Sequence, residues 1–193
     1  IYPKGFRTTV EVEGLSARLE GRSRPGHFEG VATVVLKLFE IVQPRFAFFG
    51  RKDAQQSRII QQMATDLNLD TEVIVAPIVR EPDGLALSSR NAYLSPEDRR
   101  AATALHRSLE AVRREIASGE RDAARLIVVA RRILDSEPGV KIDYVEIADA
   151  ETLEPVTVLR NRCFILIAAL VGKTRLIDNA LIEPEAETFR VTI

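Results

Sequence analysis

The fold of the first half of the chain is decided by the stretch Phe46-Ala47-Phe48-Phe49-Gly50-Arg51-Lys52-Asp53-Ala54-Gln55-Gln56. A short apolar run stops at a glycine, a basic pair and an acid follow, and a helical pattern then begins. This order is typical of a buried parallel strand that ends in a loop and continues into a helix N-terminus, where unpaired backbone N–H groups can receive an anion. A plain turn with solvated charges, in which Asp53 caps the helix, fits the same residues.

Helical and strand-like segments alternate on both sides of this stretch. Apolar spacing predicts one helix from Phe28 to Val42 and another from about Ala54 to Leu67. Thr71 to Ala76 has the composition of a buried strand, and Thr8 to Val12 alternates like a short half-exposed one. Helix, strand, helix and strand at this spacing predict a parallel α/β unit, so we interpret residues 1–94 as part of a Rossmann-like domain.

The composition of the chain changes after Leu94. Ser95-Pro96-Glu97 is a strong helix start, with a capping serine and a proline at the first helical position. From there we expect two helices, Ser95 to about Ala117 and Arg121 to about Ser136, and three strands, Lys141–Ile147, Cys163–Val171 and Thr174–Ile182. This order predicts a small α+β domain over residues 95–183, and we expect residues 184–193 to form a frayed tail. The expected fold class is therefore α/β, a partial Rossmann-like parallel-sheet domain followed by a small α+β C-terminal domain.

Length, charge and cysteine content exclude several classes of protein. The 193 residues are 46% apolar and 28% charged, an ordinary globular mixture. A net charge of −1 gives no broad basic field for nucleic acid and no polybasic membrane patch. Cys163 is the only cysteine, which rules out an internal disulfide framework and indicates a reducing, cytoplasmic compartment. We expect Cys163 to be a buried small hydrophobe, and no apolar stretch approaches the roughly 18 to 20 residues of a membrane span.

A second polar stretch runs from Pro77 to Asn91 and ends in Ser88, Ser89 and Arg90. Serine hydroxyls and backbone N–H groups can donate hydrogen bonds to phosphate oxygens, and arginine offers a planar fork. A surface loop with a hydroxyl-based turn and a solvated Arg90 is the other interpretation. Because this stretch and Gly50–Asp53 each follow a candidate parallel strand, we expect both to lie at the same edge of the sheet, where ligands bind in α/β folds.

Three long motifs, taken together, resemble the pantothenate synthetase (pantoate–β-alanine ligase) family. They are Arg24 to Phe39, Phe49 to Gln56, and Val79 to Asn91, in the right order and at the right spacing. Thr174 to Asn179 also fits the ending of the family, so the resemblance covers Tyr2 to about Glu183.

The resemblance implies an activity and a set of site residues. The family joins pantoate to β-alanine with ATP, through an acyl adenylate, and releases pyrophosphate and AMP. The residues it implies for ATP are Gly50, Arg51, Lys52, Asp53, Val79, Leu87, Ser88, Ser89 and Arg90. Lys52, Ser88, Ser89 and Arg90 would stabilise charge on the phosphates, Val79 would contact adenine through its backbone, and Gln56 would bind pantoate. Magnesium would arrive with ATP, no metal-ligand set is expected in the chain, and a homodimer follows from the family.

The chain also departs from the family pattern. The family carries a His-x-Gly-His motif near its N-terminus, whereas His27 and His106 are the only histidines here and neither lies in such a motif. We therefore expect on the order of one hundred N-terminal residues, about one compact domain, to be missing and the chain to be inactive alone. His27 is expected to be structural, Arg51 stands where relatives often have Glu, and Leu87 stands where Met is common.

Two other hypotheses stay open at this point. One is a non-catalytic nucleotide-binding or dimerisation module, because the catalytic histidines are absent from the sequence. The other is a different nucleotidyltransferase of the same superfamily.

Overall fold

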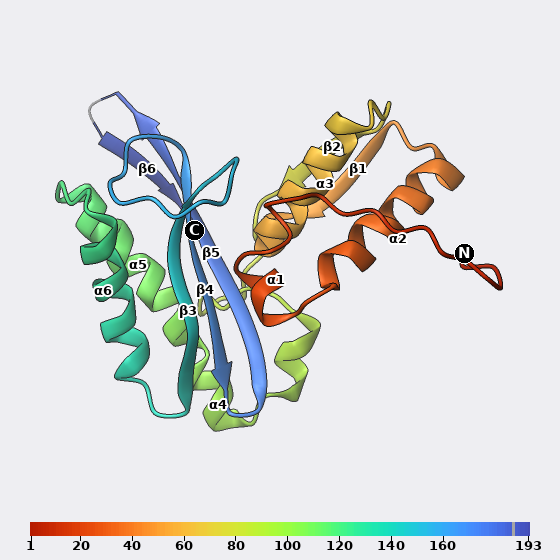
Figure 1. Cartoon of the computed structure of the whole chain (residues 1–193). Coiled ribbons are helices and arrows are strands. Elements are labelled where there is room, and N and C mark those ends of the chain that lie inside the picture. Colours follow the sequence, from red (N-terminus) through yellow and green to blue (C-terminus); the bar gives the residue numbers. More distant parts are fainter. Residues whose placement is uncertain (187) are drawn as a thin grey trace. The chain divides into compact units, whose positions relative to one another are not determined.

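The computed structural model describes residues 1–186 and 188–193, which form two compact units, Ile1–Pro77 and Ile78–Ile193 (Figure 1). This division falls earlier than the boundary that we expected near Leu94. The reason is that residues before Leu94 bond to later elements of the second unit. Arg80 pairs with Asp178 at 2.8 Å, and Asp83 pairs with Arg99 at 2.6 Å.

The first unit has the parallel α/β arrangement that the sequence predicts. Its elements in chain order are α1 (Glu20–Ser23), α2 (His27–Val42), β1 (Phe46–Gly50), the 3₁₀ turn η1 (Arg51–Asp53), α3 (Ala54–Asp66) and β2 (Glu72–Ala76). β1 and β2 pair in parallel, with Gly50 opposite Ala76, so both strands end at the same edge. α3 packs against both strands and against α2.

One face of β1 is more exposed than a buried strand would be. Phe46 and Phe48 are 43% and 70% exposed, so the prediction of a buried strand is wrong for this face. Successive side chains of a strand point to opposite sides, and only the side that carries Ala47 and Phe49 is partly covered. The ring of Phe49 meets that of Phe39 from α2 edge-on, with centroids 6.4 Å apart.

The strand predicted at Thr8 to Val12 is absent from the described residues, which are irregular there. The backbone N–H of Val10 instead donates to Thr33 Oγ1 on α2, at 2.9 Å. The backbone of this segment is therefore bonded at Val10 to a helix side chain rather than to a neighbouring strand.

The second unit confirms the predicted helices and antiparallel strands. Its elements are η2 (Ser89–Tyr93), α4 (Pro96–Ala101), α5 (Thr103–Ala117), α6 (Ala123–Asp135), β3 (Val140–Asp149), β4 (Cys163–Val171), β5 (Thr174–Glu185) and β6 (Thr188–Thr192). Among the described residues the sheet order is β3-β4-β5-β6, with every neighbouring pair antiparallel. α5 and α6 lie together on one face of this sheet (Figure 1). The single helix expected from Ser95 is divided at Ala102 into α4 and α5.

The core of the second unit lies between the two helices and the sheet. Leu105, Leu109 and Ile116 of α5 are fully buried in one hydrophobic cluster that also contains Ile165 and Ile167 of β4. Each such side chain contributes about 1.5–3 kcal/mol by leaving water. The unit therefore has a hydrophobic core of its own.

Residues 188–192 do not form a frayed tail, so that expectation is corrected. They form β6, in which Arg190 lies opposite Glu183 and Val191 opposite Ile182 of β5. The guanidinium of Arg121 stacks over the ring of Phe189, 4.9 Å from its centroid. The apolar residues Phe189 and Val191, which alternate with polar ones, were the sequence signal for this strand. Residue 187, which the expected tail includes, lies outside the described residues.

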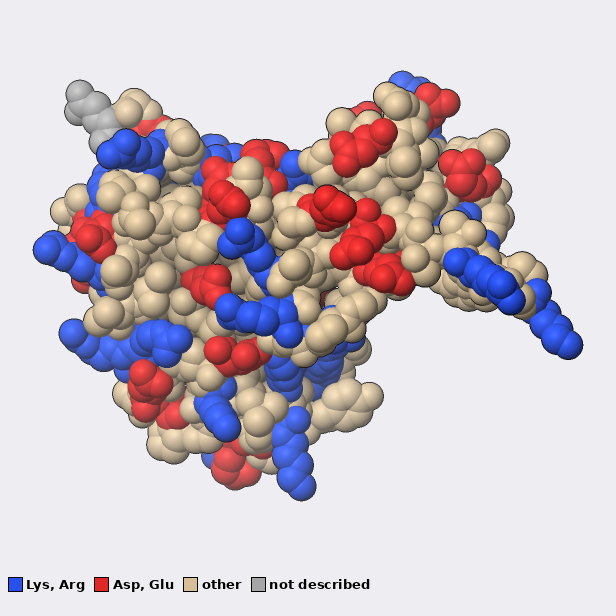
Figure 2. Space-filling view, viewed as in Figure 1, with Lys and Arg blue, Asp and Glu red and all other residues tan. Residues whose placement is uncertain are grey.

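The surface carries charges of both signs. On the face drawn in Figure 2, Lys and Arg side chains are interspersed with Asp and Glu side chains rather than gathered into one basic field. Within the part of the chain that the structure describes, the helices are too short or too polar to cross a membrane.

Candidate functional site

The turn from β1 into α3 is held by a buried serine. Gly50 ends β1, and Arg51–Asp53 form the single turn η1 before α3 begins. Ser57 Oγ lies 3.2 Å from both the Gly50 and the Asp53 carbonyl oxygens, to which its hydroxyl can donate. Asp53 stands at the N-cap of α3 but makes no capping hydrogen bond there, and its side chain is exposed. The predicted N-cap position of Asp53 is therefore confirmed, but its carboxylate does not cap the helix by a hydrogen bond.

The predicted ATP residues of this turn differ in accessibility. Arg51 is buried, so its guanidinium is not open to a ligand. Lys52 and Gln56 are partly exposed, and Asp53 is exposed. The turn thus carries one cation and one anion beside the end of a strand, and Gln56 in the first turn of α3 adds an amide.

Gln55 is a further residue of this region that the sequence interpretation missed. Its side chain is buried and makes three hydrogen bonds, accepting from Glu20 N at 3.0 Å and donating to the Leu15 and Arg18 carbonyls at 2.7 and 2.9 Å. These bonds fasten the segment before α2 to the first turn of α3. The available signal was a polar residue four positions before Ile59, on the buried face of the helix.

The polar stretch of the second unit begins as a tight hairpin. Arg80 and Ala86 form an antiparallel bridge, and Leu87 N donates to the Val79 carbonyl at 2.9 Å. Gly84 makes the turn with a φ of +91°. We call residues 79–87 the hairpin. Val79 and Leu87, both predicted to contact ATP, lie opposite each other at its open end and are exposed.

Ser88, Ser89 and Arg90 follow directly after the hairpin. Ser88 Oγ accepts a hydrogen bond from Arg90 N at 3.3 Å, which caps the 3₁₀ turn η2. The interpretation as a hydroxyl-based turn is thus confirmed locally. The same turn leaves Ser89 and Arg90 exposed, where a hydroxyl and a guanidinium can meet an anion.

Neither histidine lies in an exposed catalytic arrangement. His27 Nε2 is 3.0 Å from Arg24 Nη1, and its ring lies against Phe28 with centroids 5.0 Å apart. His106 is partly buried beside Gly84, with Nε2 3.9 Å from Glu110. Burial, and secondly the positive charge of Arg80, lower the pKa of His106 below 6.5.

The cysteine is buried in β4, as the sequence predicts. Burial raises the pKa of the Cys163 thiol to about 12, so it is not a thiolate at neutral pH. Across the residues that the structure describes, no group of three His, Cys, Asp or Glu side chains could hold a metal ion.

We expected Gly50–Asp53 and Ser88–Arg90 to lie at the same edge of the parallel sheet. The structure supports this position only for Gly50–Asp53, in the first unit. The pairing of Gly50 with Ala76 places the end of β2 beside the turn that carries Lys52. Ser88–Arg90 belong to the second unit, and their meeting with this turn stays a prediction.

The fold and the turn define a class of protein. A parallel strand that ends in Gly50 and a turn carrying a lysine, followed by a small unit of helices on an antiparallel sheet, is the arrangement of an α/β ligand-binding protein with an added α+β unit. The family model described as Pantoate-beta-alanine ligase matches residues 1–181. The chain therefore belongs to the pantoate-beta-alanine ligase family, as its motifs predict.

Relatives and solved structures agree with this family. The chain is 52% identical over 183 residues to a pantothenate synthetase of Roseiflexus sp. (strain RS-1), covering 95% of this chain and 66% of that protein. It is 54% identical over 182 residues to the pantothenate synthetase of Thermotoga neapolitana, covering 94% of this chain and 65% of that protein. A crystal structure of pantothenate synthetase from Thermus thermophilus matches with a TM-score of 0.88 and 46% identity, over 92% of this chain and 64% of that chain.

A further structure in the family carries ligands. It is pantoate-beta-alanine ligase from Francisella tularensis complexed with beta-gamma ATP and beta-alanine, with a TM-score of 0.65 and 35% identity, over 92% of this chain and 59% of that chain. The chain thus spans just under two thirds of the length of the relatives that it matches.

Proposed function

We propose that the full-length protein containing this chain is an ATP-dependent ligase that condenses pantoate with β-alanine to pantothenate. The observation that carries the proposal is the family match over residues 1–181, which includes the Gly50–Asp53 turn and Ser88–Arg90. The Francisella relative, complexed with beta-gamma ATP and beta-alanine, supports the choice of substrates.

The first chemical step transfers adenylate to pantoate. A carboxylate oxygen of pantoate attacks the α-phosphorus of ATP, the bond to the bridging oxygen breaks, and pyrophosphate leaves with the electron pair. Negative charge builds up on the phosphate oxygens in this step. Preorganised cations and hydrogen-bond donors stabilise such charge, and removing one typically costs about 10²–10³-fold in rate. Lys52 is proposed as the cation nearest the α-phosphate, with Ser88, Ser89 and Arg90 donating to the phosphates.

The second step forms the amide. The neutral amine of β-alanine attacks the acyl carbon, the carbon–oxygen bond to the phosphate breaks, AMP leaves, and the amine nitrogen loses a proton to water. No protein nucleophile is needed, so positioning and electrostatics supply the catalysis. The burial of Cys163 agrees with this scheme.

The remaining roles follow the family motifs. Gln56 is proposed to hydrogen-bond pantoate, Val79 to contact adenine through its backbone, and Gly50, Arg51, Asp53 and Leu87 to contribute to the ATP site. A magnesium ion would arrive with ATP and be held largely by phosphate oxygens. A homodimer in the cytoplasm is the proposed state of the full-length protein.

The test is the stoichiometry of the reaction catalysed by the full-length protein. We expect one AMP, one pyrophosphate and one pantothenate per turnover, and no pyrophosphate when pantoate is omitted. Pyrophosphate release without pantoate would contradict the proposal. We expect the 193-residue chain alone to make no pantothenate, since it spans 66% of the length of a relative that is 52% identical.

A further inference from the structure

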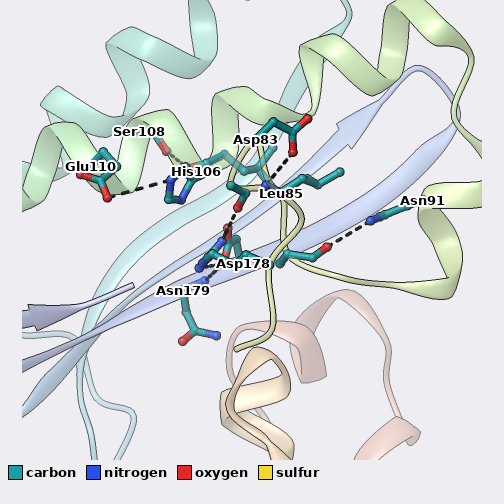
Figure 3. A network of polar contacts seen from close by, with 12 residues as sticks. Asp83, Leu85, Asn91, His106, Ser108, Glu110, Asp178 and Asn179 are labelled. Atoms are coloured by element: carbon teal, nitrogen blue, oxygen red, sulfur yellow. Dashed lines mark hydrogen bonds and ion pairs between the residues drawn. The ribbon is translucent and has the colours of Figure 1, made fainter. Parts of the chain in front are cut away.

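A buried ion pair joins the hairpin to β5 (Figure 3). Arg80 donates two hydrogen bonds to Asp178, from Nη1 to Oδ2 and from Nη2 to Oδ1, both at 2.8 Å. The two side chains are 13% and 1% exposed. Two parallel hydrogen bonds between a guanidinium and a carboxylate fix both the distance and the relative orientation of the two groups, which a single ion contact does not.

Both partners are also bonded to backbone. Arg80 Nη1 donates to the Gly84 carbonyl at 2.8 Å, so the guanidinium spans the hairpin from its first strand to its turn. Asp178 Oδ1 accepts from Asn179 N at 2.8 Å, which orients the carboxylate on β5. Together the two side chains form a rigid connection from the β5 backbone to the hairpin turn.

The exit of the hairpin is fastened separately by Asn91. Its Nδ2 donates to the Ala86 carbonyl at 3.1 Å and to Glu81 Oε1 at 3.2 Å. Its backbone N–H donates to the Ser88 carbonyl at 3.0 Å. Ser88, Ser89 and Arg90 therefore lie between the hairpin and Asn91, and their backbone position depends on where the hairpin is held.

Stability alone is a weak reason for a buried ion pair. Taking both charges out of water is costly, and well-packed apolar residues in place of such a pair are often neutral or stabilising. Removing one partner leaves an uncompensated buried charge and is strongly destabilising. What the Arg80–Asp178 pair supplies beyond an apolar contact is fixed geometry.

We propose that Arg80 and Asp178 are positioning residues, which hold the hairpin so that Ser88, Ser89 and Arg90 meet the phosphates in the productive geometry. This rests on the function proposed above. It also assigns a role to Asp178 within the stretch Thr174–Asn179, which fits the ending of the family. A displacement of about 1 Å at a positioning group can cost on the order of 10²-fold in rate.

The test uses the full-length protein and compares single with double substitutions. We expect Arg80→Met and Asp178→Leu each to lower the melting temperature, because each leaves an unpaired buried charge. The double variant should regain most of that stability. Its kcat for pantoate-dependent pyrophosphate release should remain at least about tenfold below wild type, with the KM for pantoate little changed.

A second ion pair on the same sheet provides the matched control. Arg175 on β5 donates two hydrogen bonds to Asp143 on β3, at 2.6 and 3.0 Å, but these side chains are 28% and 39% exposed. The double variant Arg175→Met/Asp143→Leu should keep the wild-type kcat.

The outcomes separate the proposal from the function on which it rests. A stable Arg80→Met/Asp178→Leu variant with wild-type kcat would overturn the positioning role and leave the ligase function standing, whereas an inactive wild-type protein would overturn both. Should the double variant not fold, Arg80→Lys decides, because lysine keeps the charge but not the fork. A folded Arg80→Lys variant with reduced kcat supports positioning, and one with wild-type kcat rejects it.

Discussion

Gly84 and His106 lie so close together that residue 84 has no room for a side chain. A Cβ atom built on Gly84 would lie 2.0 Å from Cδ2 and 2.5 Å from Nε2 of the imidazole. The φ of Gly84 is +91°, a backbone conformation that residues with a side chain rarely adopt. The hairpin turn therefore requires glycine for two independent reasons, its backbone conformation and its contact with α5.

These two reasons predict the effect of Gly84→Ala. The backbone conformation alone should cost about 1–2 kcal/mol, and the clash with His106 should add about 1–3 kcal/mol. Gly119→Ala is the control, because Gly119 has a φ of +102° in the same unit but open space around it. Urea unfolding should give a clearly larger loss of stability for Gly84→Ala. Equal losses in the two variants would show that the contact with His106 does not matter.

His106 should make the stability of the second unit dependent on pH. Its pKa is lowered from 6.5, firstly by burial and secondly by the charge of Arg80, while Glu110 and Asp178 oppose the shift and Arg113 adds to it. The unfolded chain therefore binds a proton more readily than the folded one. The free energy of unfolding should fall as the pH drops below 6.5 towards the lowered pKa, and this loss should be complete below it.

The measurement is urea unfolding of wild type and His106→Gln over a series of pH values. The substitution removes the titrating group, so the difference in stability between wild type and variant should shift in favour of the variant as the pH falls below 6.5. A difference that stays constant across the series would contradict the assignment.

Gln55 should matter for the stability of the first unit although it is not proposed to touch a substrate. Gln55→Leu removes its three hydrogen bonds to the segment Leu15–Glu20 at once. Breaking hydrogen bonds to buried groups costs about 1–3 kcal/mol. Gln61→Leu, on the same helix but partly exposed, is the control and should change stability by less than about 0.5 kcal/mol. Similar unfolding midpoints for the two variants would reject the role given to Gln55.

Lys52→Ala should separate catalysis from folding in the full-length protein. Losing the cation proposed nearest the α-phosphate should lower kcat/KM by about 10²-fold or more, with the circular dichroism spectrum unchanged. Lys173→Ala changes an exposed lysine in the turn between β4 and β5 and should retain full activity. Wild-type-like turnover in Lys52→Ala would remove Lys52 from the mechanism.

Most helices and strands could be predicted from local sequence patterns, because the residues that make up each pattern lie close together in the chain. The apolar run ending at Gly50 and the spacing of Ile59, Ile60 and Met63 are enough to predict β1 and α3. Ser95-Pro96 likewise predicts the start of α4, where Ser95 Oγ accepts from Asp98 N at 3.1 Å.

Features that depend on distant partners were not predictable in this way. The Arg80–Asp178 pair joins residues 98 positions apart, and no pattern near Arg80 indicates it. For the same reason the change of composition at Ser95 suggested a boundary near Leu94, although the hairpin is bonded to later elements. Thr8–Val12 has the composition of a strand, but Val10 bonds to Thr33 on a helix.

The same difference between local patterns and distant partners applies to the residues of the candidate site. Lys52, Gln56 and Ser88–Arg90 were predicted as site residues because they lie in contiguous motifs, and their roles stay predictions. Ser57 and Gln55, which hold the turn of the first unit, were missed because their partners are backbone groups that only the fold brings near.

The most direct test of the central claim is isotope exchange between labelled pyrophosphate and ATP, catalysed by the full-length protein in the absence of β-alanine. If the reaction passes through an acyl adenylate, exchange requires pantoate but not β-alanine, because the first step reverses before the amine is needed. We predict rapid exchange with pantoate and none without it. An enzyme that makes pantothenate but shows no exchange until β-alanine is added would contradict the account.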